Sequence, residues 1–261
     1  MIKPYIIYAP PFKVTSGGIR VMWGLYGWLL AKGQIVYVNE IIQGQNSIGI
    51  YPEIVHGNPL EATKIVRYIL NKPGVMGKGT PGVNFKPGPM EFDPTDELYY
   101  FSRLYGVAKD QNHYMFLPIL NTHLFKDQGK KRTKTAYFVG KGVRQLADAN
   151  VHPKNAILID KKIAQDQSVL ADLLNECEAL YCYDPVTAMT ELSRLCGCRI
   201  VMINPKYSRD DFKKYEPGFN GISWARDEKI KLDTQAFKKH YMEMKEEFDR
   251  KLDIFISNTQ K

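Results

Sequence analysis

Residues 183–203, YDPVTAMTELSRLCGCRIVMI, decide the fold. The stretch opens with Asp184 and Pro185, continues through a predicted helix of about three turns, and stops at Gly197 between two cysteines. The apolar segment CRIVMI follows at once and predicts a strand. A helix that ends in a small turn directly before a buried strand is typical of an α/β unit, in which the helix packs closely on a sheet.

The same alternation of strands and helices continues on both sides of this stretch. In the second half we expect strands at 135–140, 156–160, 179–183 and 198–203, with helices from Val143 onward and across 167–177. In the first half we expect strands at 5–9, 35–39, 98–102 and 114–119, with a helix over 19–31. Alternating strands and helices predict an α/β fold with parallel sheets covered on both faces.

A further helix is predicted over residues 60–71. Asn58 and Pro59 have the residue types of an N-cap and of the first helical position, and apolar residues follow between Ile65 and Leu70. Residues 73–96 are rich in Pro and Gly and show little periodicity, which predicts a long surface loop.

Two αβ domains joined by a linker are expected, followed by a long helix. The sequence turns polar and basic near 121–134, so the first domain is predicted at 1–125 and the second at 126–233. Residues 234–261 show a helical pattern, with apolar residues at three- and four-residue spacing from Phe237 to Phe255. The length of this pattern predicts a C-terminal helix that packs across more than one layer.

The charge of the chain restricts its partners. A net charge of +8 and a pI of about 9.1 favour an anionic partner such as nucleic acid, nucleotide phosphates or membrane phospholipids. The basic stretches at 126–134 and 210–215 are not interleaved with aromatic residues in the manner of a single-strand binding surface. We therefore expect no nucleic-acid partner.

The N-terminal segment and the cysteines indicate in which cellular compartment we expect the protein. The N-terminal segment MIKPYIIYAPP predicts a first strand rather than a signal peptide, and the apolar run VMWGLYGWLLA is too short to span a bilayer. Four cysteines lie between positions 177 and 198, without the second C-x-x-C or histidine pair of a zinc site. We expect buried free thiols in a reducing cytoplasm, no metal and no cofactor.

Three loops that follow predicted strands carry the candidate binding residues. They hold Gly17 and Gly18; Gly140, Lys141, Gly142 and Arg144; and Thr187 and Ala188. Ligands of open α/β sheets bind outside the carboxyl ends of strands, where N–H groups of helix starts suit phosphate. Each loop alone also fits an ordinary turn, and neither a P-loop nor a G-x-G-x-x-G fingerprint is present. Together the three loops predict a nucleotide site.

Four stretches resemble GT-B-type glycosyltransferases, and within them the family 4-like enzymes of bacterial polysaccharide and lipopolysaccharide synthesis. They are TSGGIRVMWGLYGWLLAKGQIVYV, YPEIVHGNPLEATKIVRYILNKPG, YFVGKG and LYCYDPVTAMTELSRLCGCRIVMI. The likeness extends from about Tyr5 to Trp224, although the chain is short for this fold. The resemblance implies a GT-B-like fold, with two Rossmann-like domains facing a cleft, and transfer of a sugar from a nucleotide donor.

The resemblance assigns roles to the stretch that opens this section. Glu191 matches the glutamate that holds the ribose of the nucleotide, and Thr187 and Ala188 match the helix start that contacts the diphosphate. The first carboxylate of the family falls on Tyr183 in this chain. The adjacent Asp184 either meets a sugar hydroxyl in its place or caps the helix, so a retaining or an inverting outcome stays open.

The resemblance also assigns residues in the other loops. Lys141 matches a basic residue beside the phosphates, and Gly17 and Gly18 match glycines that let the donor approach. No D-x-D tripeptide occurs in the chain, which fits a metal-independent reaction. An inverting reaction needs a base near the acceptor hydroxyl, and Glu53 and His56 are the candidates. Their other interpretation is hydrogen bonding within a loop.

The expected function is transfer from a UDP- or GDP-sugar to a hydroxyl of a glycan or lipid-linked acceptor. We expect the chain in the cytoplasm, with a peripheral contact to the inner face of an anionic membrane. Two other classes remain open at this point: a non-catalytic αβ module that binds a nucleotide or sugar, and a basic nucleic-acid-binding protein.

Overall fold

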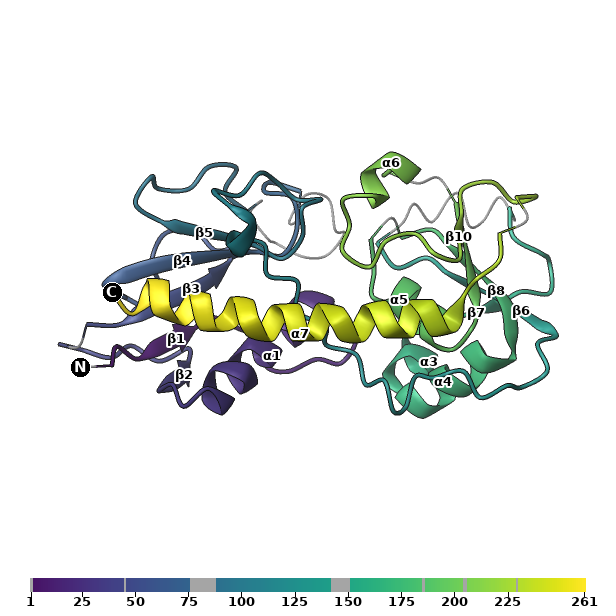
Figure 1. Cartoon of the computed structure of the whole chain (residues 1–261), viewed down its shortest axis with the longest axis horizontal. Coiled ribbons are helices and arrows are strands. Elements are labelled where there is room, and N and C mark those ends of the chain that lie inside the picture. The colour runs from purple at the N-terminus through teal and green to yellow at the C-terminus, as the bar shows by residue number, and fades with distance from the viewer. Residues whose placement is uncertain are drawn as a thin grey trace. The chain divides into compact units, whose positions relative to one another are not determined.

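The chain folds as an α/β protein made of two units (Figure 1). The computed structural model describes residues 2–44, 46–75, 88–141, 151–184, 186–203, 206–228 and 230–261. The first unit comprises Met1–Ile119 and Met244–Lys261, and the second comprises Leu120–Glu243. Helix α7 (Thr234–Thr259), the long yellow helix in Figure 1, therefore contributes residues to both units.

The first unit contains a parallel five-stranded sheet, which we name sheet A. Its strands are β1 (Tyr5–Ile7), β2 (Val36–Val38), β3 (Ile48–Pro52), β4 (Lys64–Ile69) and β5 (Glu97–Tyr100), in the order β2-β1-β3-β4-β5. Ile6 pairs with Tyr37 on one side and with Gly49 on the other. Strand β2 is therefore added on one side of β1, and the later strands β3, β4 and β5 are added on the other side.

The helix predicted over 60–71 is wrong, because strand β4 occupies the central half of this segment. Asn58 closes a turn instead of capping a helix: its Oδ1 accepts from Ala62 N at 3.0 Å, and its Nδ2 donates to Ala62 O at 2.8 Å. The following segment contains the β-branched Ile65, Val66 and Ile69, which suit a strand paired on both sides.

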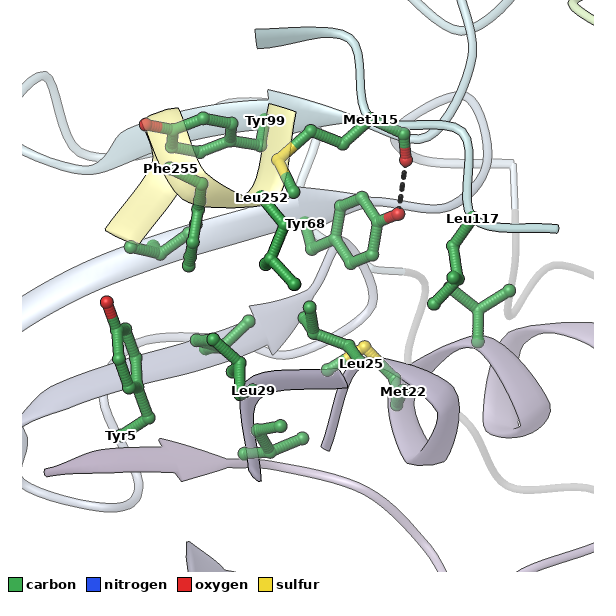
Figure 2. Close-up of a cluster of buried hydrophobic side chains, with 14 of the residues drawn as sticks. Tyr5, Met22, Leu25, Leu29, Tyr68, Tyr99, Met115, Leu117, Leu252 and Phe255 are labelled. Atoms are coloured by element: carbon green, nitrogen blue, oxygen red, sulfur yellow. Dashed lines mark hydrogen bonds between the residues drawn. The ribbon is translucent and has the colours of Figure 1, made fainter. Parts of the chain in front are cut away.

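The segment 114–119 is extended but forms only one bridge to the sheet in the described part of the chain, from Tyr114 to Tyr100. Met115, Phe116 and Leu117 are nevertheless buried. The Tyr68 hydroxyl donates to the carbonyl of Met115, as Figure 2 shows. The expected strand is thus replaced by a buried segment held by a side chain.

The second unit contains another parallel five-stranded sheet, sheet B. Its strands are β6 (Lys134–Phe138), β7 (Ile157–Leu158), β8 (Cys177–Cys182), β9 (Arg199–Met202) and β10 (Ile222–Ser223), in the order β10-β9-β8-β6-β7. Counted within each unit, both sheets have the strand order 2-1-3-4-5. This is a common doubly wound order, with its switch point between the first and third strands.

The described helices that accompany the sheets are α1 (Gly17–Ala31), α3 (Lys161–Gln165), α4 (Gln167–Glu176), α5 (Met189–Leu195) and α6 (Arg209–Phe212), with a 3₁₀ turn at Gln111–His113. The helix expected from Val143 lies outside the described residues. Helix α5 has 7 residues and is shorter than expected. It ends at Leu195, and two residues later Gly197 has a φ of +80°, where a Cβ would overlap the Arg132 guanidinium.

The core of the first unit lies between helix α1, sheet A and the second half of α7. Figure 2 shows Leu29 of α1, Tyr5 and Tyr99 of the sheet, and Leu252 and Phe255 of α7 pointing toward one another. The Phe255 ring lies 5.9 Å from the Tyr5 ring and 4.8 Å from the Tyr99 ring, measured between centroids. The C-terminal helix is therefore part of the hydrophobic core of the first unit.

Hydrogen bonds fix the end of α7 to the start of the chain. The hydroxyls of Thr259 and Tyr5 lie 2.6 Å apart. The Lys64 ammonium donates to the carbonyls of Asn258 and Thr259, at 3.2 and 3.3 Å. A cation at the last carbonyls of a helix satisfies unpaired acceptors and complements the helix dipole.

Leu252→Ala should lower the free energy of unfolding by about 2–5 kcal/mol, because it leaves a cavity in a core where Leu252 is fully buried. Met242→Ala on the same helix is the matched control, since Met242 is 39% exposed and should change stability by less than about 0.5 kcal/mol. Chemical denaturation of both variants measures the difference. Equal stability of the two variants would contradict this packing.

Candidate functional site

The switch point of sheet B lies between strands β6 and β8. The strand that follows β6 in the chain, β7, lies beside β6 on one side of this point. The strand that follows β8, β9, lies beside β8 on the other side. Crevices outside the carboxyl ends of strands at such a point are the usual binding positions of doubly wound sheets. The segments that leave the sheet here are 139–141 after β6 and 183–184 after β8.

Asp184 joins these two segments. Its Oδ2 accepts from the backbone N–H of Lys141 at 2.9 Å, and its Oδ1 accepts from the N–H of Val186 at 3.3 Å. The side chain therefore closes a turn two residues ahead and does not cap α5, which begins at Met189. Burial raises the pKa of the Asp184 carboxyl, and the nearby positive charge of Lys141 offsets part of that effect.

Gly140 makes this close approach possible. Its φ is +53°, a conformation that L side chains rarely adopt. A Cβ at this position would overlap Asp184 Oδ2 and would lie 2.6 Å from Phe138 Cε1. The neighbouring Lys141 has an exposed side chain on a backbone that Asp184 fixes. The result is an exposed lysine on a main chain that is held beside the carboxyl ends of β6 and β8.

Tyr183 extends the β8 ladder by one hydrogen bond, from its N–H to Phe138 O at 2.9 Å. Its side chain is buried, and its hydroxyl lies 2.7 Å from His152 Nδ1. The His152 ring stacks on Tyr137 with centroids 3.8 Å apart. Burial and then the charge of Arg226 lower the pKa of His152. No sequence pattern indicated His152, because its partners Tyr137 and Tyr183 come from other segments.

Thr187 and Ala188 precede helix α5, as the sequence indicates. Thr187 Oγ1 accepts from Met189 N at 3.3 Å, and its carbonyl accepts from Thr190 N at 3.1 Å. Ala188 is the N-cap residue and makes no side-chain cap bond. The side chain of Thr187 thus already bonds one N–H at the helix start.

Glu191 is only 3% exposed and accepts two hydrogen bonds at Oε1. The donors are the hydroxyls of Tyr215, at 2.9 Å, and Thr190, at 3.1 Å. Burial raises the pKa of the Glu191 carboxyl and lowers the pKa of the fully buried Arg194 to about 10. Glu191 therefore lies among internal partners, and Tyr215 is a contact that the sequence did not indicate. Tyr215 also lines a cavity of about 390 Å³.

Arg194 holds the segment that carries Tyr215. Its Nη1 donates to the carbonyls of residues 217, 218 and 220, at 3.0–3.2 Å. Its guanidinium carbon lies 4.0 Å from the centroid of the Phe237 ring of α7. Arg194 thereby fixes this segment against α5 and α7, and with it the donor to Glu191.

Gly17 and Gly18 begin helix α1 in the first unit. A Cβ at Gly17 would meet nothing within 4 Å, and one at Gly18 would meet Leu70 Cδ1 at 3.6 Å. The side chain of Ser16, the N-cap residue, makes no cap bond. Local packing therefore does not require glycine at position 17, which leaves close approach of a ligand as its predicted use.

Glu53 follows strand β3 and is buried. Its Oε2 accepts from Leu70 N at 2.9 Å, so it joins the carboxyl ends of β3 and β4. Leu70 is also the neighbour of Gly18, which places Gly18 and Glu53 at the same edge of sheet A. His56 is exposed in the loop that follows.

Gly142 and Arg144 lie outside the described residues, so their predicted contacts stay predictions. Within the described ranges, no group of three or more His, Cys, Asp or Glu residues is arranged to hold a metal ion. Among the same residues, no helix is long and apolar enough to cross a membrane. The chain matches no protein-family model and no curated protein.

Gly140→Ala should destabilise the second unit by about 1–3 kcal/mol more than Gly129→Ala. Both positions have positive φ, but a Cβ at Gly129 would meet nothing within 4 Å, whereas one at Gly140 would overlap Asp184. Thermal unfolding of the two variants separates overlap from backbone strain. If they lose equal stability, Gly140 is an ordinary turn residue.

Glu191 should give the protein a pH-dependent loss of stability. Because the folded-state pKa is raised, the native state keeps a proton that the unfolded state has lost. This contribution is fully present below the unfolded pKa of about 4.3 and is lost as pH rises through the folded pKa. Glu191→Gln should therefore lose less stability than the wild type as the pH rises above the unfolded pKa.

Denaturation at several pH values measures this effect, with Glu243→Gln as the control at a carboxylate that is 55% exposed. The control should follow the wild type. A Glu191→Gln profile parallel to both would mean that the carboxyl titrates as an exposed group.

Proposed function

We propose that the protein transfers a sugar from a nucleoside diphosphate donor to an acceptor hydroxyl, as a GT-B-type glycosyltransferase and without a metal. The observation that carries the proposal is the junction of Gly140, Lys141 and Asp184 at the switch point of sheet B. Of these three residues, the sequence resemblance assigns Lys141 to a position beside the phosphates, whereas the first carboxylate of the family falls on Tyr183, next to Asp184. The shared strand order of the two sheets is consistent with a two-domain enzyme of this type.

Lys141 is the residue best suited to the leaving group. A departing nucleoside diphosphate gains negative charge in the transition state, and a fixed cation stabilises that charge most at that stage. The backbone of Lys141 is fixed by Asp184, and its side chain is exposed. The ammonium therefore reaches outward from a main chain that is held at the switch point.

Asp184 has a positioning role in this proposal. Both of its carboxylate oxygens accept backbone N–H groups, so it holds the Lys141 turn and the segment before α5 together. Glu191 has internal donors, so a ribose contact requires a ribose hydroxyl to replace Tyr215 or to share the carboxylate with it. In the first unit, Glu53 and His56 remain the proposed bases for the acceptor, with Gly17 and Gly18 beside the donor.

The proposal is tested by titration calorimetry with UDP, GDP and a single-stranded oligonucleotide, followed by an assay of nucleotide-sugar hydrolysis in EDTA. We expect one nucleoside diphosphate to bind and its sugar to be released slowly without acceptor. Binding without any turnover, also after acceptor glycans are added, would indicate a binding module. Binding of the oligonucleotide alone, or activity that Mg²⁺ or Mn²⁺ must restore, would contradict the proposal.

Lys141→Ala should lower turnover by about 100-fold and weaken donor binding less, because the charge that it meets is largest in the transition state. Lys141→Arg should restore activity only in part, since a planar guanidinium does not place its charge at the same point. Lys154→Ala removes another exposed lysine of the second unit and is the matched control. A normal turnover number in Lys141→Ala, measured by steady-state kinetics, would remove Lys141 from the site.

A further inference from the structure

His152 joins the two strands that flank the switch point of sheet B. Its ring stacks on Tyr137 of β6, with centroids 3.8 Å apart and planes at 14° to each other. Its Nδ1 lies 2.7 Å from the hydroxyl of Tyr183, the residue that follows β8. His152 is only 6% exposed, so both contacts are made inside the protein. One ring therefore contacts both segments that lead to the proposed donor site.

The same two segments are joined at the carboxyl edge of sheet B, where its parallel strands end. The Lys141 N–H donates to Asp184 Oδ2 at 2.9 Å, a contact that we call the Lys141 junction. Tyr183 directly precedes Asp184, and Tyr137 lies on the strand that leads to Lys141. Successive side chains of an extended chain point to opposite faces. His152 therefore holds one face of the segment whose other face makes the junction.

The position of Asp184 depends on the residue before it. In the described part of the chain, the ladder between β6 and β8 ends with the bond from Tyr183 N to Phe138 O at 2.9 Å. Beyond it, the thiol of Cys182 donates a weak hydrogen bond to Asp184 O at 3.2 Å. The Tyr183 side chain is buried, and the contact of its hydroxyl with His152 is the stronger anchor.

The segment that carries His152 is also held. Val151 packs against the apolar cluster that contains Tyr181 and Tyr183. Ala156 N donates to Pro153 O at 2.9 Å, which closes a turn before β7. The ring of His152 therefore extends from a main chain that packing and a turn keep in place.

The contact with Tyr183 depends on the charge of His152. A neutral ring with its proton on Nε2 accepts the hydroxyl hydrogen of Tyr183 at Nδ1, whereas a protonated ring can only donate. Among the described residues, the ionisable groups that face the ring are Tyr137, Tyr183 and Arg226, which follows β10. None of these three is a carboxylate that would stabilise a protonated ring. Burial and then the charge of Arg226 lower the pKa of His152, which favours the neutral ring.

We infer that His152, as a neutral ring, is a positioning residue that keeps Asp184 in place to hold the main chain of Lys141. Protonation of the ring changes its contact with Tyr183 and should loosen the Lys141 junction. The link from this junction to sugar transfer rests on the proposed function, whereas the junction itself is measured directly.

The test is amide hydrogen exchange of the full chain followed by NMR, because the Lys141 N–H is the donor of the junction. His152→Phe keeps a ring against Tyr137 and removes Nδ1. It should lower the protection of the Lys141 amide about tenfold, the upper end of what one hydrogen bond contributes. Tyr183→Phe removes only the hydroxyl and should have the same effect. Thermal unfolding shows whether each variant is folded.

Matched controls separate positioning from general stability. His123→Asn changes an exposed histidine of the same unit and should leave the Lys141 amide as in the wild type. The Leu170 amide, which donates to Asp166 O at 2.9 Å in α4, is the reference within each variant. If Leu170 loses as much protection as Lys141, the role of His152 is general and the inference is overturned. Unchanged protection of Lys141 in both phenylalanine variants would overturn it as well.

A pH series tests the role of the neutral ring. Because its pKa is lowered, His152 should protonate below its ordinary value of about 6.5. After correction for the intrinsic pH dependence of exchange, the protection of Lys141 should fall with the same midpoint as the NMR titration of His152. Burial also raises the pKa of the Asp184 carboxyl, so a variant must separate the two groups.

His152→Asn is that variant, because its amide keeps a hydrogen-bonding group near the position of Nδ1 and does not titrate. It should retain protection of the Lys141 amide better than His152→Phe and should lack the pH step. A step that remains in His152→Asn belongs to Asp184 and would overturn the inference.

The outcomes also separate this inference from the proposed function. Loss of Lys141 protection in His152→Phe, in a protein that binds neither UDP nor GDP, would support the positioning role and contradict the proposed function. Transfer from a nucleotide sugar by a protein whose Lys141 amide is unaffected in His152→Phe would do the reverse.

Discussion

The structure depends most on the apolar stripe of helix α7. Phe237 of this helix packs against Arg194 in the second unit, and Phe248, Leu252 and Phe255 belong to the hydrophobic core of the first. One continuous helix of 26 residues thus contributes buried aromatic side chains to both units. Phe255 and Thr259 near the end of α7 contact the side chain of Tyr5 in the first strand. The first unit therefore contains contacts between segments that lie far apart in the sequence. Such contacts carry a large loop-closure entropy and must be stabilised by burial.

The two sheets have the same strand order, yet their carboxyl edges have different chemistry. In sheet B the edge has a tight glycine turn, a buried carboxyl group and the exposed side chain of Lys141. In sheet A it has exposed apolar residues on loops held by Asn39, Trp23 and Tyr114. Strand order determines where loops gather, and loop sequence determines what they bind. The proposed donor site therefore belongs to one of two sheets that share a strand order and differ in their loops.

Sequence alone was enough to predict elements whose pattern reflects burial. Helix α1, strand β8 and helix α7 have strong apolar periodicity, and each lies within two residues of the range expected. The segment 60–71 was misassigned because Asn58 and Pro59 also suit a turn, and because a short apolar run fits either a strand or a helix. The segment forms a strand because it pairs with β3 and β5. The residues of these two strands lie elsewhere in the chain, so the local sequence does not show the pairing.

The candidate site shows the same limit at the level of single residues. Gly140, Lys141 and Asp184 could be selected from sequence because they follow strands, and the topology brings them together. Sequence alone could not predict that His152 pairs with Tyr183 or that Glu191 pairs with Tyr215. Each pair joins residues at least 24 positions apart. The side-chain partners of a buried polar group depend on packing, whereas the position of a loop depends mainly on strand order.

The buried residues Glu191 and Arg194 of α5 depend on such partners from other segments. A carboxyl group or a guanidinium is costly to bury unless hydrogen bonds replace its contacts with water. Arg194 donates to three carbonyls of residues 217–220, and Glu191 accepts the hydroxyl of Tyr215 from the same region. Each charge therefore fixes one part of a segment that has little regular structure of its own. Replacing this pair with apolar residues would fill the space but would leave those carbonyls without donors. The polar contacts of α5 thus specify the path of the chain between α6 and β10.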